Sequence, residues 1–534
     1  MPMLPTHRHV TATLAVCLLA LASSHRVAVG ADADPVVPTG SGRVRGVRLP
    51  DGGAAFRGIP FAAPPVGALR WQPPAPPAAW SGVRDASAFS AACAQPLLGD
   101  WNRMNAETGR EDCLYLNVVT PAWPAKTPLP VMLWIHGGGN MGGTGATPFF
   151  AAGGLERRGV ILVTINYRLG VFGFFAHPAL RRASPHHSSG NYGLLDQIAA
   201  LRWVRDNIAR FGGDPRNVTV FGQSAGAIDI AALMASPLAT GLFHKAISQS
   251  GSITRHPTPA ADLEAAGERW AQHLPVQAGQ DPLAYLRGLD AAAVLTAARS
   301  KDGPGLPVEQ AIDGWVLLRT PAEAFHAGTQ APVPMIVGHT SRELPVTKPA
   351  DGVRADIERG VPAEHRARVL AAYGLADGGP GLADDPVLGA LSVQFIVDVQ
   401  FRCTGYLQRT WIEASNQAAY GYQFDRTAPG REAEGAQHSA ELPYVFGAFP
   451  ADGNIGGAYD GADRRLSDVI QRYWTNFAKT GNPNGPGLPA WPRFATTHSA
   501  IEFLPDGTAA ARPAFRRTQC DAFRAAVESE PLYR

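Results

Sequence analysis

The sequence lacks a surplus of either charge, and charged residues are scarce. Its 534 residues include 47 lysines and arginines against 45 aspartates and glutamates. Charged residues make up 17% of the chain and apolar residues 45%. Without a basic surplus, the chain offers nothing that would attract nucleic acid or an anionic membrane surface. This composition also excludes intrinsic disorder, so we expect a globular protein that binds no nucleic acid.

Cysteine is also scarce, with five residues in the whole chain. One of them, Cys17, lies in the N-terminal segment. The other four are Cys93, Cys113, Cys403 and Cys520. An even number is compatible with two disulfides in an oxidising compartment, although four cysteines allow three pairings and their spacing does not choose among them. No Cys or His cluster has the spacing of zinc ligands, so we expect no metal.

The first 31 residues indicate an export signal. Two histidines and an arginine at positions 7–9 precede an apolar run over residues 11–22, and small residues follow. Cleavage after Ala31 fits the small-residue rule, with Ser24 as an alternative. The apolar run is shorter than the roughly 20 residues of a membrane-spanning helix, and no second such run follows, so we expect no stable membrane insertion. Removal of residues 1–31 leaves 45 basic and 45 acidic residues, and the protein is predicted to be secreted or periplasmic.

Apolar strands alternate with helices after residue 128. The sequence predicts strands at 129–135, 159–166, 217–222 and 243–249, and a helix that begins at Tyr192 and ends at the Gly-Gly-Asp-Pro of 212–215. The helix repeats apolar residues at three- and four-residue steps: Leu194, Ile198, Leu201, Val204, Ile208 and Phe211. Apolar strands of this kind predict an α/β fold with a mostly parallel sheet covered on both faces. The pattern is mainly helical after about Thr254, and we expect one domain over residues 32–534 with long insertions.

One hydroxyl lies between two glycines directly after the strand at 217–222. Gly222, Ser224 and Gly226 match the G-x-S-x-G pattern between a predicted strand and a predicted helix. Glycines on either side let the backbone turn sharply enough to lift the serine oxygen clear of the sheet. Ser224 is therefore the candidate nucleophile, and an ordinary tight turn is the alternative.

A serine nucleophile needs donors for the oxyanion that forms when it attacks a carbonyl. The run His-Gly-Gly-Gly-Asn (136–140) follows a predicted strand. The N–H groups of Gly138 and Gly139, with that of Ala225 after the serine, are the candidate oxyanion hole. A rival interpretation is a dinucleotide site, because Gly137, Gly139 and Gly142 match G-x-G-x-x-G. That site requires a helix at these glycines and an acidic residue about 20 residues on; the strand at 159–166 lacks such a residue, so we expect no cofactor.

The general base and its acidic partner are harder to find. His438 is a candidate base because it lies in a glycine-flanked loop late in the chain, where this strand order places the histidine. Two acids remain open at this level. Glu343 follows the predicted strand at 333–340, whereas Glu441 lies three residues from His438.

Seven segments distributed along the chain form a specific set. They are residues 58–71, 111–121, 136–143, 191–215, 221–227, 438–447 and 473–484. On these motifs the chain resembles the type-B carboxylesterase family, which includes the cholinesterases, within the α/β-hydrolase fold, and the similarity extends over nearly the whole mature sequence. The resemblance implies a triad of Ser224, Glu343 and His438 with the oxyanion hole named above, and leaves Glu441 as a structural residue.

The resemblance also implies the disulfide pairing. It joins Cys93 to Cys113 in a loop near the active-site gorge and Cys403 to Cys520 among the late helices. The family's additional bridge between these two has no cysteines here.

Four positions depart from the family pattern. Gln223 replaces the glutamate that cholinesterase-like members carry before the nucleophile, and a neutral amide attracts a cationic alcohol less, so choline esters are disfavoured. Trp101 resembles the family's cation-binding tryptophan but has different spacing; it either lines the gorge or packs in the fold. Ser439 and Leu344 each replace a glycine beside the triad, which affects loop geometry and removes no reacting group.

We therefore predict an exported carboxylic ester hydrolase that acts on a small-molecule ester through an acyl-enzyme. An alternative is a specialised esterase for a bulky natural or xenobiotic ester, such as a toxin or plant phenolic ester. A further alternative from another class is a non-catalytic, cholinesterase-like binding module. The sequence does not predict the natural ester or the oligomeric state.

Overall fold

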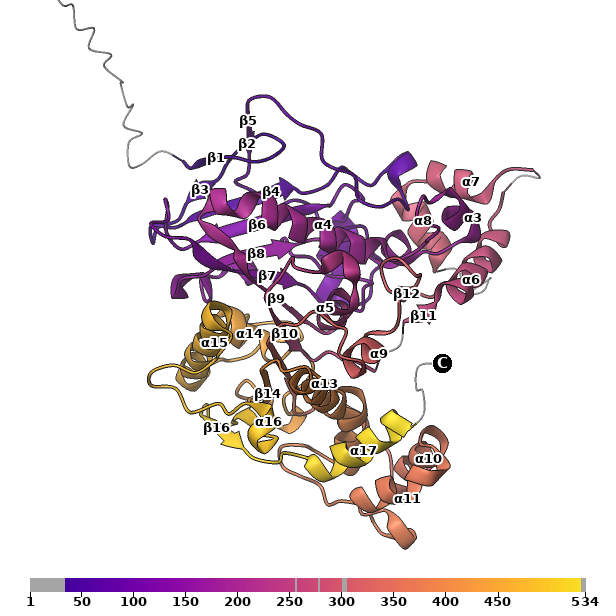
Figure 1. Cartoon of the computed structure of the whole chain (residues 1–534), viewed down its shortest axis with the longest axis vertical. Helices are drawn as coiled ribbons and strands as arrows, with labels where there is room; N and C mark the ends of the chain where they lie inside the picture. Colours follow the sequence, from indigo (N-terminus) through magenta and orange to yellow (C-terminus); the bar gives the residue numbers. More distant parts are fainter. Residues whose placement is uncertain (1–33, 255–256, 277–278, 300–304, 530–534) are drawn as a thin grey trace, which may run out of the picture. The chain divides into compact units, whose positions relative to one another are not determined.

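A computed structural model describes residues 34–254, 257–276, 279–299 and 305–529 (Figure 1). The export signal predicted for residues 1–31 lies outside the described residues, and the domain boundary at residue 32 stays a prediction.

The described residues contain an eleven-stranded sheet in the order β16-β15-β14-β13-β10-β9-β7-β8-β6-β4-β3 (Figure 1). The strands are β3 (Val47–Arg48), β4 (Ala54–Pro60), β6 (Tyr115–Thr120), β7 (Leu129–Ile135), β8 (Ile161–Ile165), β9 (Gly213–Gln223), β10 (Lys245–Gln249), β13 (Met335–Thr340), β14 (Ala419–Phe424), β15 (Ala500–Phe503) and β16 (Ala509–Arg512). All pairings from β8 to β15 are parallel, whereas those at both ends of the sheet are antiparallel. The mostly parallel sheet predicted from the apolar strands is confirmed.

Alternate residues of β7 pack into two different apolar cores, one on each face of the sheet. In β7, Val131, Leu133 and Ile135 pack into one apolar cluster, and Met132 and Trp134 pack into another. Successive side chains of a strand point to opposite faces, so a strand buried on both faces must be apolar throughout. This explains the unbroken apolar run at 129–135.

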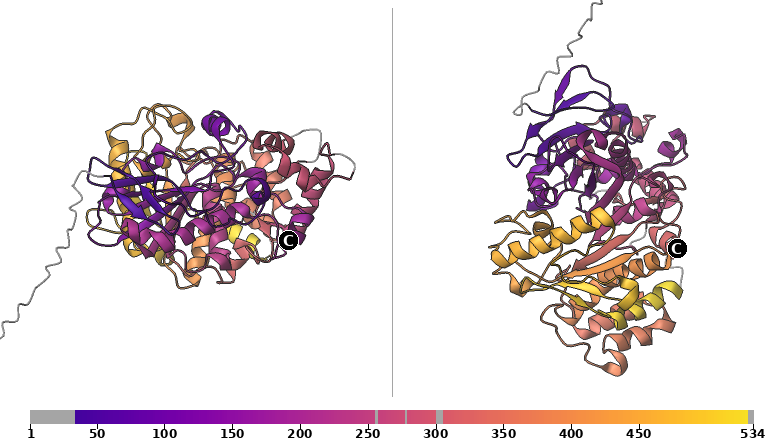
Figure 2. Two further views of the ribbon diagram at one scale, coloured as in Figure 1. Left: turned by 90° about the horizontal axis from the view of Figure 1, so that it is seen from above. Right: turned by 60° about the vertical axis from the view of Figure 1, so that its left-hand side comes forward.

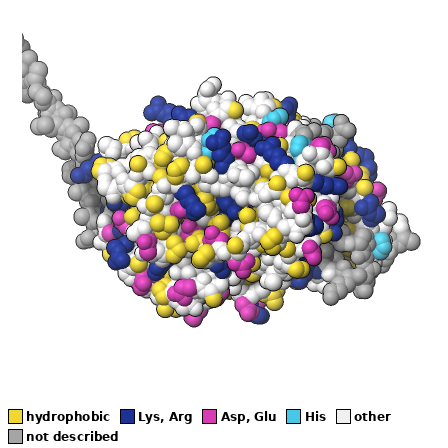
Figure 3. All heavy atoms as spheres, turned by 90° about the horizontal axis from the view of Figure 1, so that it is seen from below, with side chains coloured by type: hydrophobic (Ala, Val, Ile, Leu, Met, Phe, Trp, Pro, Cys, Tyr) yellow, Lys and Arg dark blue, Asp and Glu magenta, His cyan; other side chains and the backbone are white. Residues whose placement is uncertain are grey.

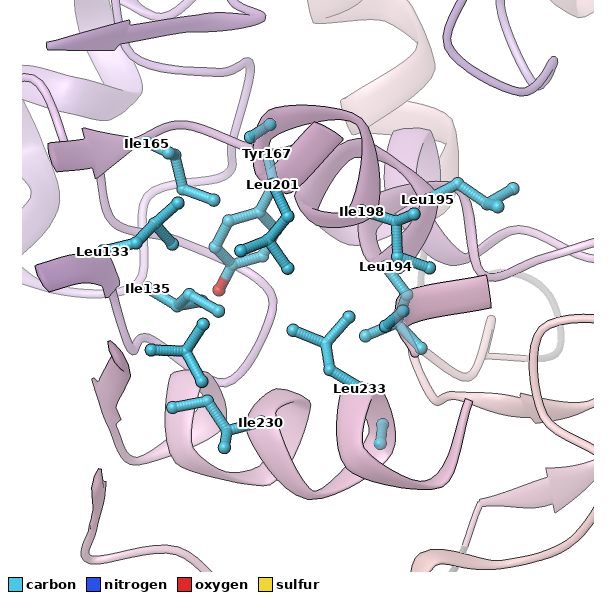
Figure 4. Packing of buried hydrophobic residues seen from close by; sticks show 14 of the residues in the cluster. Leu133, Ile135, Ile165, Tyr167, Leu194, Leu195, Ile198, Leu201, Ile230 and Leu233 are labelled. Atoms are coloured by element: carbon cyan, nitrogen blue, oxygen red, sulfur yellow. The ribbon is translucent and has the colours of Figure 1, made fainter. Parts of the chain in front are cut away.

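Helices cover each face. On one side lie α4 (Tyr192–Asn207) and α5 (Ala225–Ala235), whose leucines and isoleucines meet β7 and β8 (Figure 4). On the other lie α14 (Leu442–Phe446) and α15 (Gly461–Thr480), the long orange helix in the right-hand view of Figure 2. The six apolar residues predicted to line one face of the helix at 192–211 are all buried in the first core. The helix itself ends at Asn207, and a 3₁₀ turn over Ile208–Phe211 leads into β9.

The chain after Thr254 is mainly helical, as expected. Its helices are α6 (Ala260–Gln272), α7 (Pro282–Gly288), α8 (Ala291–Ala298), α9 (Pro321–His326), α10 (Ala350–Gly360), α11 (Ala363–Ala372), α12 (Leu391–Val397), α13 (Cys403–Ala414), α16 (Phe494–Thr497) and α17 (Arg517–Ser529), besides α14 and α15. Strands β13 and β14 interrupt this series, and β13 lies close to the predicted position 333–340.

The described part of the chain has neither a membrane-spanning helix nor a metal-binding cluster. None of its helices is long and apolar enough to cross a bilayer, and it contains no group of three histidine, cysteine or acidic residues arranged to hold a metal ion. On the face drawn in Figure 3, basic and acidic side chains are interspersed with apolar ones.

Both disulfides implied by the family resemblance are present. Cys93 is bonded to Cys113, and Cys403 at the start of α13 is bonded to Cys520 in α17. The first closes a loop with a sequence separation of 20 residues and the second one of 117.

Replacing Cys403 and Cys520 together by alanine should destabilise the protein more than the same change at Cys93 and Cys113. Loop-closure entropy gives a loss of about 5 kcal/mol for the long loop and about 3 kcal/mol for the short one. Guanidinium unfolding followed by tryptophan fluorescence without reductant measures both. Equal losses would show that loop length does not set their contribution.

Candidate active site

Ser224 occupies the sharp turn between β9 and α5. Its backbone has φ 57° and ψ −124°, a conformation that non-glycine residues rarely adopt. A Cβ on Gly226 would lie 2.1 Å from the Ile135 carbonyl oxygen, and one on Gly222 would lie 2.8 Å from the carbonyl carbon of Gly226. Both positions therefore require glycine, and the turn predicted from G-x-S-x-G has the sharp geometry expected of it.

The glycine loop after β7 lies against this turn. A Cβ on Gly137 would lie 3.0 Å from Cβ of Ser224. Gly138 and Gly139 have φ 115° and 64°, and Gly139 lines a hollow of about 380 Å³, open to solvent, together with Ala225. The structure thus brings residues of the predicted oxyanion hole to one hollow beside the serine turn. The rival dinucleotide interpretation fails here, because residues 136–147 form a loop and no helix begins at these glycines.

His438 contacts Glu343 rather than Glu441. Its Nδ1 lies 2.5 Å from Glu343 Oε2, and its backbone N–H donates to the Glu343 carbonyl at 3.2 Å. The Glu343 side chain is fully buried, and its Oε1 accepts from the Thr340 N–H at 2.8 Å. This carboxylate holds the ring with its proton on Nδ1 and leaves Nε2 as an acceptor.

The negative charge on Glu343 is the main cause of the raised pKa of His438. Burial alone lowers the pKa of the ring, but the Glu343 carboxylate and a weaker effect of Glu441 raise it by more. The pKa of His438 therefore lies above its ordinary value.

The acceptor nitrogen of His438 faces the residue before the serine. Nε2 lies 3.2 Å from the side-chain amide nitrogen of Gln223, which is placed to donate to it. Among the described residues the Ser224 hydroxyl makes no hydrogen bond to this ring. Catalytic hydrogen bonds are often long in unliganded enzymes and tighten when substrate binds. Because Gln223 immediately precedes Ser224 in the sequence, Nε2 of His438 contacts the residue next to the serine.

Glu441 is buried and interacts electrostatically with Glu343 and His438. Burial and the neighbouring Glu343 carboxylate raise its pKa to about 7. Its Oε1 accepts from Gln249 Nε2 at 3.1 Å, and Gln249 Oε1 accepts from the Trp474 indole N–H at 3.1 Å. These contacts tie α15, β10 and the histidine loop together.

A buried carboxylate that the sequence analysis missed holds the glycine loop at residues 136–143, the predicted oxyanion loop, through Asn140. Asp229, one turn along α5 from the serine, has no exposed surface. Its Oδ1 accepts from Asn140 at 2.9 Å and Gln310 at 2.7 Å, and its Oδ2 accepts from Gln197 at 2.6 Å. The Tyr167 hydroxyl donates to Asn140 Oδ1 at 3.1 Å. An acidic residue alone in the apolar segment 225–235 was the available signal, but its partners come from distant segments.

Trp101 borders the glycine loop. Its side chain is 46% exposed, and its Cη2 lies 3.3 Å from where a Cβ on Gly138 would be. Leu97, Leu98 and Met104 are also exposed. Of the two interpretations left open for Trp101, this position favours the one in which the indole lines the approach to the serine.

Comparison with known proteins yields close relatives. Residues 33–359 and 383–522 match the model of the Carboxylesterase family. The chain is 38% identical over 487 residues to fumonisin B1 esterase from Sphingopyxis macrogoltabida, covering 87% of this chain and 85% of that protein. It is 37% identical over 473 residues to para-nitrobenzyl esterase from Bacillus subtilis (strain 168), covering 86% and 92%.

Solved structures agree with these sequence matches. A structure of PNB esterase aligns with a TM-score of 0.78 at 32% identity, covering 91% of this chain and 99% of that one. A Geobacillus stearothermophilus carboxylesterase aligns with a TM-score of 0.74, also at 32% identity, covering 92% and 99%. The predicted α/β-hydrolase fold is confirmed.

Asp229→Asn should lower kcat about 10- to 100-fold with little change in KM. The new amide group would face three amide donors, which loosens the oxyanion loop, and small misplacements near a reacting centre have effects of this size. Steady-state hydrolysis of p-nitrophenyl acetate measures it. Asp463→Asn is the matched control. Asp463 is a buried aspartate on α15 that pairs with Arg426, so its replacement should affect thermal stability alone. Equal kcat losses in the two variants would contradict the role of Asp229.

Proposed function

Because this chain belongs to the carboxylesterase family and is a carboxylic ester hydrolase, we propose that it cleaves esters through an acyl-enzyme formed on Ser224. The observation that carries the proposal is the contact between His438 Nδ1 and Glu343 Oε2, which leaves the other ring nitrogen facing the serine turn.

His438 acts as the general base in this mechanism. As a substrate carbonyl enters, the Ser224 hydroxyl replaces the Gln223 amide as the partner of Nε2 and transfers its proton there while its oxygen attacks the carbonyl carbon. Glu343 stabilises the imidazolium that forms. The ring then gives the proton to the leaving alcohol.

The negative oxygen of the tetrahedral intermediate is held by the N–H groups of Gly138, Gly139 and Ala225. Such donors act best when they are fixed before the reaction, and the network around Asp229 provides that fixation. Water then repeats the cycle on the acyl-enzyme, with His438 again as the base, and releases the acid.

A bulky natural ester is the second candidate substrate class. One relative at 38% identity is named for its action on fumonisin B1, and the exposed apolar side chains of Leu98 and Trp101 border the glycine loop. These residues can contact an extended apolar group of a bulky ester, whereas a small ester would not reach them.

We also propose that the protein is exported. The N-terminal pattern of residues 1–31 supports this location, as do the two disulfides. The mature enzyme would then work in the periplasm or outside the cell.

Ser224→Ala should reduce kcat by about 10⁶-fold, because removal of a nucleophile disables the whole triad. Turnover of p-nitrophenyl esters and of fumonisin B1 measures this, and labelling by a fluorophosphonate should disappear in parallel. The control is Ser184→Ala, at the end of α3 (Pro178–Ala183). Retention of turnover by Ser224→Ala would overturn the mechanism, whereas turnover of the small esters alone would exclude the fumonisin substrate.

The rate should rise with pH as His438 loses its proton. Since the pKa of His438 is raised in the folded enzyme, the acid limb of kcat/KM should have its midpoint above 6.5. Glu343→Gln removes the main cause of that rise, so the midpoint should move to lower pH while kcat falls about 10³- to 10⁴-fold.

Glu441→Gln is the matched control for this titration. Glu441 contributes less to the raised pKa of His438, so its removal should move the midpoint by less. A larger shift for Glu441→Gln than for Glu343→Gln would contradict the assignment of the acid.

A further inference from the structure

A charged side chain lies in the wall of the hollow beside Gly139. Gly139 and Ala225 form part of this hollow, Ile228 and Val308 contribute apolar surface, and Glu309 is the charged residue among those of its lining that the structure describes. A group attached to the reacting carbonyl therefore meets a carboxylate on entering the hollow.

No basic side chain neutralises Glu309 within the part of the chain that the structure describes. The residue is exposed, and its contact there is with the Thr258 hydroxyl, which donates to Oε2. A carboxylate that faces a cleft with low-dielectric walls acts strongly on what enters it.

The segment that carries Glu309 is fixed to the active site. The next residue, Gln310, donates to Asp229 at 2.7 Å, and its carbonyl accepts from the Thr258 N–H at 3.0 Å. Ala311 then exchanges two hydrogen bonds of 2.8 Å with the Asn191 side chain. Because Asp229 also holds the glycine loop through Asn140, the segment that carries Glu309 is tied to the same carboxylate as that loop.

We propose that Glu309 determines the charge preference of the enzyme. It favours esters that carry a positive charge in the group occupying the hollow and disfavours those that carry a carboxylate there. This inference rests on the proposed function. The neutral side chain of Gln223 leads us to expect that choline esters are disfavoured. The proposal changes that expectation, because Glu309 supplies a negative charge from another segment of the chain.

The test uses three p-nitrophenyl esters of similar size. They are the 4-(trimethylammonio)butanoate, its neutral isostere the 5,5-dimethylhexanoate, and the glutarate monoester. Glu309→Gln keeps an acceptor for Thr258 and removes the charge. The ratio of kcat/KM for the cationic ester to that for the neutral ester should fall about five- to tenfold, and the ratio for the anionic ester should rise by a similar factor, as expected for unit charges about 8 Å apart in a partly hydrated site.

Glu358→Gln provides the matched control. It makes the same change of net charge at an exposed position on α10 and should leave both ratios as they are. Added salt should reduce the wild-type preference by screening.

One outcome would contradict the role of Glu309 and another would contradict the proposed function, and the two can be distinguished. Turnover of all three esters with ratios unchanged by Glu309→Gln would overturn the role of Glu309 alone. Failure of the wild-type enzyme on all three esters, with no fluorophosphonate labelling of Ser224, would overturn the proposed function and this inference with it.

Discussion

The active-site geometry depends on direct backbone contact between the end of β7 and the start of α5. No side chain fits between Gly226 and the Ile135 carbonyl, so the helix begins against the strand and Ser224 takes its strained conformation. Such strain costs about 1–3 kcal/mol and persists only where the surroundings fix it. Here the Ser224 N–H donates to Gln249 at 2.9 Å, and the Ser224 carbonyl accepts from two N–H groups of α5 at 3.0 Å. The same contact brings the glycine loop that follows β7 to the serine.

Three buried carboxylates surround this contact, and each is stabilised differently. Glu343 has the imidazole of His438 and a backbone N–H. Asp229 accepts from three side-chain amides. Glu441 has an amide partner, and its pKa of about 7 lets it take up a proton near neutral pH. A buried carboxylate without such partners would be costly. Among the described residues Glu441 Oε2 has no hydrogen-bond partner, which fits a carboxyl whose raised pKa favours its neutral form. The arrangement places the carboxylates of Glu343 and Asp229, each with its own partners, near one imidazole, which suits a site where that imidazole becomes positive.

Local patterns were sufficient to predict the elements, because they are set by neighbours in sequence. The two-sided burial of β7, the apolar stripe of α4 and the turn at Ser224 all follow from periodicity and glycine spacing. The partners of Asp229 could not be found in this way, since they lie 32, 81 and 89 residues away. Glu309 was equally hidden, because an isolated glutamate in a loop has no pattern. The choice between Glu343 and Glu441 needed the family resemblance, since proximity in sequence favoured the residue that does not contact His438.

The strand order explains why that proximity was misleading. β9, β10, β13 and β14 are parallel neighbours, so their carboxyl ends lie along one edge of the sheet, where ligands usually bind. Glu343 follows β13, and the loop after β14 brings His438 to it from the adjacent strand. In the sheet, β10 lies between β9, which precedes the serine, and β13, which precedes Glu343. Gln249, the last residue of β10, is hydrogen-bonded to Glu441 and to Trp474. Glu441 is therefore held by the strand between them, which accounts for its burial close to Glu343 and His438 without a hydrogen bond to the ring.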